Sequence, residues 1–267
     1  MKIAIIGAGN LGISMAKGLI SNKVISSLYL TRRNIKELNH FKSNKKVKIT
    51  TNNALAIKNS TILIFAVQPS DFEDILKENV ANLSDHHIII STITGFSINE
   101  IEAIIGTKNN VIRAMPNTAI AVGKSMTCLS SKTKNRKVLN AARSIFNTLG
   151  TTLLIPENQM QAATVVCASG IAFWMRLIRA TSQAAIQLGF DAKEAQELAM
   201  HTCEGAANLL ISSGNHPEQE IDKVTTPKGC TIEGLNEMEH QGLSSSLIKG
   251  MVTSFDKINS IKSKEPL

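Results

Sequence analysis

A glycine-rich turn near the start of the chain constrains the fold more than any other feature of the sequence. The segment Gly7-Ala8-Gly9-Asn10-Leu11-Gly12 follows the apolar run Ile3–Ile6 and opens a segment of helical length, Leu11–Ser21. Glycine triplets occur by chance, but a strand before the triplet and a helix after it predict a Rossmann-type dinucleotide-binding turn. Gly7 then allows the tight turn, Gly9 the close approach of a pyrophosphate, and Gly12 the packing of the helix on the strand.

Short, β-branched apolar runs alternate with helical segments through the first half of the chain. Because these runs are almost continuously apolar, they are typical of parallel strands covered on both faces. The alternation predicts an α/β fold with a doubly wound parallel sheet. The expected strands are Ile3–Ile6, Ser27–Thr31, Thr61–Val67, Ile88–Thr92 and Val111–Met115, with Ser125–Leu129 and Thr152–Ile155 extending the sheet; the expected helices are Leu11–Ser21, Phe72–Leu83, Ile98–Ile105 and Asn135–Leu149.

The pattern changes after Ile155, where Pro156 ends the last expected strand. The rest of the chain consists of helical segments, of which the longest are expected at Gln159–Leu188 and Ala192–Ser212. Asp191 is a suitable N-cap for the second of them. We therefore expect a Rossmann domain over residues 1–156 and an all-α domain over residues 157–267.

Composition narrows the classes of function. The chain has 43% hydrophobic residues, 19% charged residues and a net charge of +8, as in a globular protein that binds an anion. Aromatic residues make up only 4%, and no helix carries a basic stripe, so nucleic acid is not an expected partner. The longest apolar stretch, Ala162–Met175, is shorter than a membrane span. Four cysteines without metal-site spacing, in a chain without a signal-peptide pattern, favour reduced thiols and the cytoplasm.

The residues after the second expected strand indicate which dinucleotide binds. A site for NAD usually has a carboxylate there, whereas this chain has Thr31-Arg32-Arg33. Guanidinium groups bind a 2′-phosphate through charge-assisted hydrogen bonds, so we expect NADPH, with NADH as the second choice; a solvated Arg pair is the alternative interpretation. The ends of later strands complete the predicted cofactor site, which comprises Gly7, Gly9, Asn10, Leu11, Gly12, Thr31, Arg32, Arg33, Asn53, Ala66, Val67, Gln68, Pro69 and Asn117.

Taken together, the motifs resemble those of pyrroline-5-carboxylate reductases over essentially the whole chain. They are the Ala66–Pro69 turn, Arg-x-Met-Pro-Asn-Thr at residues 113–118, and His216-Pro217 followed by the stretch Val224–Leu235. The resemblance implies a helical domain that forms homodimers or larger rings. It also implies reduction by NAD(P)H of the ring imine to L-proline. Family substrate contacts correspond to Ser169, Lys228, Gly229, Cys230 and Thr231, with the hydroxyl of Thr231 on the ring nitrogen as the catalytic contact.

The sequence departs from the family pattern in three places. Gln68 stands where lysine is commoner. The helix opening usually written Ser-Gly-Ser-Gly-Pro-Ala is here Cys167-Ala168-Ser169-Gly170-Ile171-Ala172. Lys228 replaces a glycine in the loop whose backbone holds the substrate carboxylate in the family, so it either adds charge to that contact or faces solvent.

Two other functions fit parts of the same pattern. A 3-hydroxyacid dehydrogenase shares the fold plan but needs a lysine on the first long helix of the second domain, and there is no lysine between Lys137 and Lys193. An NADPH-binding protein without catalysis is the other alternative.

Glu197, His201 and Glu204 share one helical face, which is more typical of an ion-paired surface than of a metal site, so no metal is expected.

Overall fold

The computed structural model describes residues 1–262, which form two compact units. The first contains residues 1–169 together with the described residues from Phe255 onward, and the second contains residues 170–254. The last five residues of the helical domain expected at 157–267 lie outside the described residues. The boundary expected at residue 156 stays a prediction, since the compact units divide later, after Ser169.

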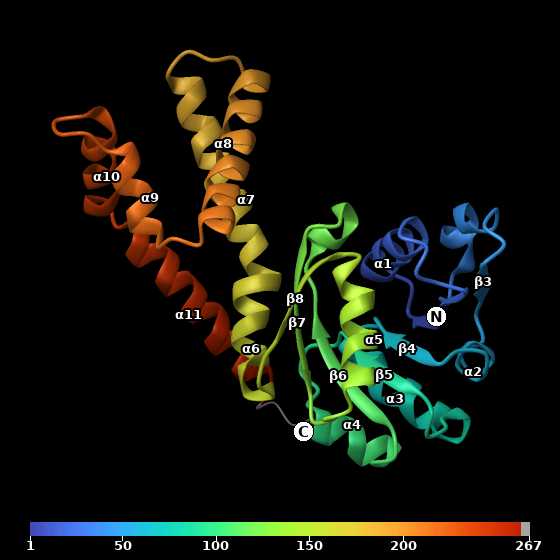
Figure 1. Cartoon of the computed structure of the whole chain (residues 1–267). Helices are drawn as coiled ribbons and strands as arrows, with labels where there is room; N and C mark the ends of the chain where they lie inside the picture. The colour runs from blue at the N-terminus through green and yellow to red at the C-terminus, as the bar shows by residue number, and fades with distance from the viewer. Residues whose placement is uncertain (263–267) are drawn as a thin grey trace. The chain divides into compact units, whose positions relative to one another are not determined.

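An eight-stranded sheet forms the centre of the first unit (Figure 1). Its spatial order is β3-β2-β1-β4-β5-β6-β7-β8, and all pairs are parallel except β6 with β7, which are antiparallel. The order reverses between β1 and β4, which makes this place the topological switch point of the sheet. The strands are β1 Lys2–Ile6, β2 Ser27–Thr31, β3 Val47–Thr50, β4 Ile62–Phe65, β5 Ile88–Ser91, β6 Asn110–Met115, β7 Ser125–Ser131 and β8 Gly150–Leu154.

Helices cover both faces of this sheet, which explains why its central strands are almost continuously apolar. On one face α1 (Asn10–Ser21) and α5 (Arg136–Asn147) bury residues such as Leu19 and Phe146 against Ile3, Ile5 and their neighbours. On the other face α2 (Asn53–Lys58), α3 (Pro69–Asn79) and α4 (Ile98–Ile105) pack against Ala4, Ile6 and Phe65. Short 3-10 segments lie at η1 (Ile35–Phe41), η2 (Val80–Asn82) and η3 (Thr118–Val122).

The predicted α/β class and the seven expected strands are confirmed, with two corrections. β3 was not among the expected strands; it includes Lys48 and pairs with β2 from Leu28 to Thr31. Lys48 on β3 lies over the ring of Tyr29 and donates to its hydroxyl at 3.2 Å, so its charged end does not oppose strand formation. β7 extends the sheet, as expected, but in the antiparallel sense.

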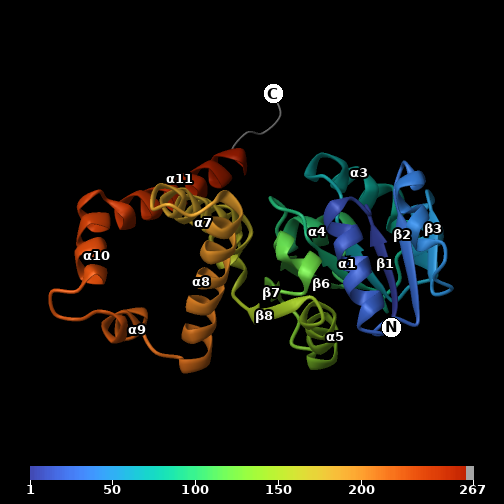
Figure 2. The same ribbon diagram turned by 90° about the horizontal axis from the view of Figure 1, so that it is seen from above.

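The region expected to form one long helix from Gln159 is interrupted. It consists of η4 (Glu157–Gln159), α6 (Met160–Ala163), a π-helical stretch η5 (Thr164–Ser169) and α7 (Gly170–Gln187). The chain continues through α8 (Ala192–Ser213), α9 (Pro217–Val224), α10 (Cys230–His240) and α11 (Leu243–Lys262). Figures 1 and 2 show α7 and α8 side by side within the second unit. The expected N-cap Asp191 accepts from the N–H groups of Lys193 and Glu194.

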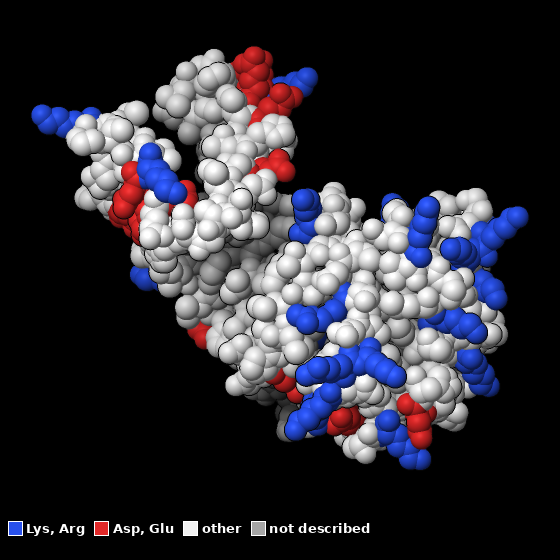
Figure 3. All heavy atoms as spheres, viewed as in Figure 1, with Lys and Arg blue, Asp and Glu red and all other residues white. Residues whose placement is uncertain are grey.

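Charge divides unevenly along the chain. Residues 1–169 carry 20 Lys and Arg against 9 Asp and Glu, whereas residues 170–254 carry 6 against 10. Figure 3 shows basic side chains spread over the visible face of the sheet-containing unit and acidic side chains gathered on the helical unit. The net positive charge therefore belongs to the sheet-containing unit, where a phosphate-rich ligand would be attracted.

The sequence predicted that the longest apolar stretch, Ala162–Met175, is shorter than a membrane span. The helical stretch Glu157–Gln187, which contains it, corrects that prediction. It is 31 residues long, and its most apolar window has a mean hydropathy of 1.4 with 17% of the window buried, which is sufficient for a membrane span by length and composition alone. Trp174 and Met175 are more than half exposed within it. An exposed apolar face of this kind marks a surface that contacts another protein chain or a membrane.

The buried His87, just before β5, makes stability depend on pH. Its Nδ1 accepts from the N–H of Ser84 at 3.0 Å, and burial followed by the charge of nearby His86 lowers the pKa of His87. Because the unfolded imidazole titrates near 6.5, stability contributed by neutral His87 is present above about pH 6.5 and lost as pH falls below it. The added slope is at most about 1.4 kcal/mol per pH unit, corresponding to one proton.

We predict that His87→Asn, which keeps an acceptor for Ser84, flattens the decline of unfolding free energy between about pH 6.5 and 5. Denaturant unfolding at several pH values measures this slope. The matched control is His201→Asn, which makes the same substitution at an exposed histidine on α8. Equal slopes for wild type and His87→Asn would contradict the prediction.

Candidate functional site

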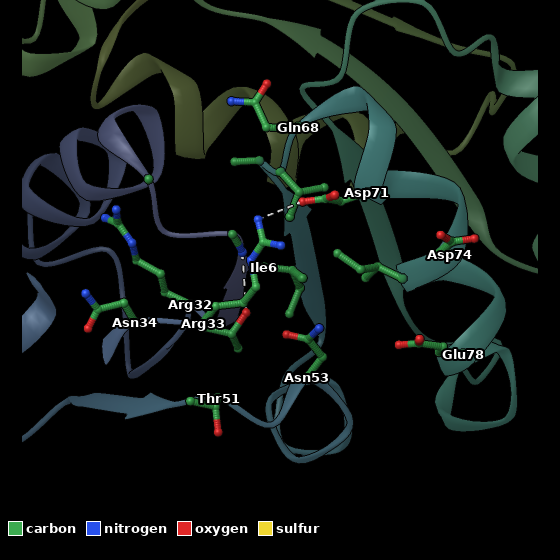
Figure 4. A pocket seen from close by; sticks show the side chains of 16 residues that line it. Ile6, Arg32, Arg33, Asn34, Thr51, Asn53, Gln68, Asp71, Asp74 and Glu78 are labelled. Atoms are coloured by element: carbon green, nitrogen blue, oxygen red, sulfur yellow. Dashed lines mark hydrogen bonds and ion pairs between the residues drawn. The ribbon is translucent and has the colours of Figure 1, made fainter. Parts of the chain in front are cut away.

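A pocket of about 610 Å³ opens at the carboxyl ends of β1 and β4, where the strand order of the sheet reverses. This is the place where open α/β sheets bind their ligands. It brings together nine of the fourteen predicted cofactor residues (Figure 4). These are Gly7, Gly9, Thr31, Arg32, Arg33, Asn53, Ala66, Val67 and Gln68; the other residues of the pocket are Ile6, Asn34, Thr51, Asp71, Asp74, Ile75 and Glu78.

The glycine-rich turn is built around Gly7. Its φ of +89° is one that other residues rarely adopt, and a Cβ there would lie 2.3 Å from Cγ1 of Val67 and 2.9 Å from the carbonyl oxygen of Ala66. The carbonyl of Thr31 accepts from the N–H groups of Gly7 at 3.2 Å and Ala8 at 2.8 Å. The hydroxyl of Thr31 also accepts from Gly7 N–H, at 3.3 Å. Thr31 therefore holds the turn in shape.

The N-terminus of α1 is available to an anion. Within the described residues no side chain caps this helix at Gly9, and its first turn contains no acidic residue. By contrast, side chains of Asn52, Ser97 and Asn135 cap α2, α4 and α5. A Cβ built on Gly9 would have no atom within 4 Å, so the space beside the helix start is open. Free N–H groups, the positive end of the helix dipole and open space fit a pyrophosphate.

The two predicted arginines have different environments. The side chain of Arg32 is 26% exposed; its Nη1 donates to the carbonyl of Ala8 at 3.2 Å, and its Nη2 lies 2.7 Å from Oε2 of Glu37. Arg32 thus supports the glycine-rich turn. The side chain of Arg33 is 91% exposed, and Figure 4 shows its guanidinium directed across the pocket to Asp71, with Nη2 to Oδ2 at 3.1 Å. Arg33 is the arginine whose donors are easier to redirect to a ligand.

Sequence reasoning missed the acidic side of this pocket. Asp71, Asp74 and Glu78 lie on α3 and line the pocket opposite β2. Their spacing places them on one face of the helix, but only the packing of α3 on the sheet brings that face to the pocket. The arrangement makes a carboxylate compete with any phosphate for Arg33.

Five predicted cofactor residues do not line the pocket. Asn10, Leu11 and Gly12 form the first turn of α1, and a Cβ on Gly12 would meet the carbonyl of Gly7 at 3.0 Å, so Gly12 allows close packing, as expected. Pro69 begins α3. Asn117 caps η3 through Ala119 N–H at 3.0 Å and donates to the carbonyl of Cys167 at 3.0 Å.

The predicted substrate loop forms one tight turn in the second unit. The carbonyl of Thr226 accepts from Gly229 N–H at 2.9 Å, and Lys228 has a φ of +58°. Pro227 followed by a positive φ fits a type II turn, whose third position favours glycine. Lys228 therefore keeps the backbone conformation of the glycine that it replaces, and its side chain is exposed. Gly229 is also required, since a Cβ there would meet Oγ1 of Thr226 at 2.4 Å.

This turn presents the start of α10. Gly229 is its N-cap, and among the described residues no side chain caps the helix there. Cys230 is exposed, and Thr231 is partly buried in the first helical turn. No hydrogen bond from the described residues holds the Thr231 hydroxyl, which leaves it available to a ligand. A second uncapped helix start thus coincides with a predicted anion site.

Ser169, the remaining predicted substrate contact, ends η5 in the first unit. The structure places the four loop residues together in the second unit and Ser169 in the first.

His201 and Glu204 lie on the surface of α8, with Nδ1 of His201 3.5 Å from Oε2 of Glu204 and both side chains mostly exposed. This is the surface ion pair expected from their helical spacing.

Family models match both parts of the chain. Residues 157–261 match the model for pyrroline-5-carboxylate reductase dimerisation, and residues 2–95 match the model for NADP oxidoreductase coenzyme F420-dependent. Pyrroline-5-carboxylate reductase 2 of Dictyostelium discoideum is 39% identical over 96% of this chain and 91% of its own length. Pyrroline-5-carboxylate reductase 1 of the same organism is 42% identical over 97% of this chain, which spans about half of that relative's length (49%).

Solved structures agree with these matches. A pyrroline-5-carboxylate reductase from Coxiella burnetii superposes with a TM-score of 0.91 at 26% identity, over 98% of this chain and 99% of that chain. The Plasmodium falciparum pyrroline carboxylate reductase with NADP bound has the same fold, with a TM-score of 0.87 at 23% identity over 98% of both chains.

Two glycines of the turn allow structure and ligand binding to be separated. We predict that Gly9→Ala leaves the melting temperature nearly unchanged but weakens NADPH binding at least about tenfold, because the new methyl group occupies the open space beside α1. Gly7→Ala instead destabilises the fold by about 2 kcal/mol or more, since it combines a positive φ with a backbone clash. Thermal unfolding and a fluorescence titration with NADPH measure both effects. Unaltered NADPH affinity in Gly9→Ala would place the pyrophosphate elsewhere.

Proposed function

Because this chain belongs to the pyrroline-5-carboxylate reductase family, we propose that it transfers a hydride from NADPH to the imine carbon of 1-pyrroline-5-carboxylate and forms L-proline. The observation that carries the proposal is the match to a reductase of this name over 91% of the relative's length. The pocket at the switch point supports it independently, since its uncapped helix start and exposed arginine suit a phosphorylated dinucleotide.

The residues of the chain supply position and charge, whereas bound NADPH supplies the hydride. The start of α1 and Arg33 would hold the two phosphate-bearing parts of the dinucleotide, and the start of α10 would hold the substrate carboxylate. A pyrroline nitrogen is protonated readily, which makes the neighbouring carbon electrophilic without a dedicated acid. The Thr231 hydroxyl then has only to orient the ring nitrogen.

A 3-hydroxyacid dehydrogenase is disfavoured by the helix that would carry its catalytic lysine. α7, the first long helix of the second unit, contains Arg176 and Arg179 but no lysine among its described residues Gly170–Gln187. An arginine keeps its proton in proteins, so it does not replace a lysine that must exchange one with an alcohol. The imine substrate requires no such exchange.

We propose further that the chain works as a homodimer or larger homo-oligomer in the cytoplasm, without nucleic acid or membrane partners. The dimerisation model covers the apolar stretch Glu157–Gln187, so contact with a second copy accounts for the exposed Trp174 and Met175 without a membrane. The four cysteines are free thiols, which is typical of a reducing compartment.

Purified protein is expected to oxidise NADPH when pyrroline-5-carboxylate is added and to release proline, detected by chromatography. Thr231→Val should lower kcat/KM roughly 10- to 150-fold through loss of one hydrogen bond to a charged nitrogen, while Thr231→Ser should keep most activity. Both variants should bind NADPH like the wild type. NADPH binding without turnover on any cyclic imine would favour the silent binding protein, and turnover of hydroxyacids alone would favour the dehydrogenase.

The Arg33–Asp71 pair yields a prediction about cofactor choice. Asp71→Asn removes the carboxylate that competes with the 2′-phosphate, so NADPH affinity should rise by up to about fivefold while NADH affinity stays constant. Arg33→Ala should lower NADPH affinity roughly 10- to 150-fold and spare NADH. Dissociation constants for both cofactors measure these changes.

Asp74→Asn is the matched control, because Asp74 lines the same pocket on α3 but is not bonded to Arg33. If Asp74→Asn raised the affinity for NADPH equally, the effect of Asp71 would come from its negative charge in the pocket and not from its bond to Arg33. Loss of affinity for both cofactors in Arg33→Ala would assign Arg33 to the pyrophosphate rather than to the 2′-phosphate.

A further inference from the structure

Two cysteines of the first unit lie in contact with each other, and neither takes part in the proposed hydride transfer. Cys128 lies on β7 and is 3% exposed; it is paired with Met115 on β6 and Leu153 on β8. Cys167 lies in η5 and is partly exposed. Their sulfur atoms are 3.9 Å apart, although 39 residues separate them in the sequence.

The segment that carries Cys167 is irregular but fixed in place. Its π-helical turns interrupt the helical stretch between α6 and α7, and such interruptions frequently occur at functional sites. The side-chain amide of Asn117 donates to the carbonyl of Cys167 at 3.0 Å, which ties the segment to the turn after β6. Two residues later the segment ends at Ser169, a predicted substrate contact.

The two thiols have different acidities. The two sulfur atoms share a hydrogen bond in which either can be the donor, and this contact lowers the pKa of Cys167 to about 7. The same hydrogen bond, followed by burial, raises the pKa of Cys128. Cys167, which is also the more exposed of the two, is therefore the thiol that ionises more readily to thiolate, the nucleophilic form of cysteine. A partly exposed thiolate beside a buried thiol has the arrangement of an attacking and a resolving cysteine.

We propose that Cys167 and Cys128 form a reversible oxidation site for hydrogen peroxide. The Cys167 thiolate attacks one peroxide oxygen, the O–O bond breaks, and hydroxide leaves, which gives a sulfenic acid. The Cys128 sulfur then attacks the Cys167 sulfur, the S–O bond breaks, and water leaves with the Cys128 proton. Peroxide is reduced by two electrons, the two thiols are oxidised to a disulfide, and the hydroxide recovers the proton that Cys167 had released.

The disulfide would join β7 to the segment that ends at Ser169. Its formation requires the sulfurs to close from 3.9 Å to about 2.05 Å, through rotation of the two side chains together with any movement of η5 that the disulfide geometry imposes. We expect turnover to fall severalfold, while NADPH binding at the Gly7–Gly12 turn is unchanged. The effect on turnover rests on the proposed function, whereas the oxidation itself does not.

The full-length protein is treated with hydrogen peroxide, and the remaining thiols are alkylated before mass spectrometry. The expected result is loss of two hydrogen atoms and a cross-linked pair of peptides containing Cys128 and Cys167, both reversed by dithiothreitol. Cys167→Ser should abolish the cross-link, and the matched variant Cys203→Ser, on α8, should retain it. The proposal would be overturned if Cys203 or Cys230 were oxidised before Cys167. It would also be overturned if all four cysteines stayed reduced at a peroxide concentration that oxidises glutathione.

A second measurement does not depend on how well a Cys128 variant folds. A sulfenic-acid probe such as dimedone should label Cys167 in the wild type at early times, and labelling should persist in Cys128→Ala. Labelling of Cys128 first would reverse the assigned roles and overturn the proposal. Turnover of the oxidised wild type should recover with dithiothreitol. A cross-link that leaves turnover unchanged would refute the effect on Ser169 while supporting the oxidation site.

Discussion

The hydrogen bonds from the N–H groups of Gly7 and Ala8 to the carbonyl of Thr31 are the constraint on which the site depends. They turn the chain sharply as it leaves β1 and fasten that turn to the end of β2. The residue at position 7 must adopt a φ of +89°, and it must lack a Cβ because Val67 lies too close for one. As a result α1 begins at the switch point of the sheet, and its N-cap Gly9 lines the pocket. Arg32 supports the same turn through the carbonyl of Ala8.

Among the residues that the structure describes, side-chain caps are absent at the two helix starts that coincide with predicted anion sites, and also at α3, which begins with Pro69, and at α6. Side chains cap α2, α4, α5 and α8, which stabilises each helix start by about 1 kcal/mol. At α1 and α10 the N-cap is glycine, and within the described chain no side chain replaces the missing hydrogen bonds. These two helix starts give up that stabilisation and keep free N–H groups for anions. They coincide with the predicted pyrophosphate site and the predicted carboxylate site.

The sequence predicted those parts of the fold that depend on local pattern. Strands buried on both faces and the glycine turn are visible as apolar runs and spacing, because each is determined by residues close in sequence. β3 was missed because it is a four-residue edge strand among lysines, one of which is stabilised by the ring of Tyr29. The acidic side of the pocket and the Cys128–Cys167 contact arise only when distant elements pack. Neither has a sequence signal beyond the residues themselves.

Lys228 shows how a departure from a family motif can preserve its backbone. A non-glycine residue at a φ of +58° costs roughly 1–2 kcal/mol, so the turn must be held by other contacts. These contacts are the hydrogen bond between Thr226 and Gly229 and the presence of Pro227, because the proline ring fixes φ at the position before Lys228. Strain of this kind persists mainly where it serves a site. Here the strained residue stands two positions before the first residue of α10, whose uncapped start carries the positive end of the helix dipole. That positive end lies in a helical unit whose overall balance of charge is negative, at the place where the family holds a carboxylate.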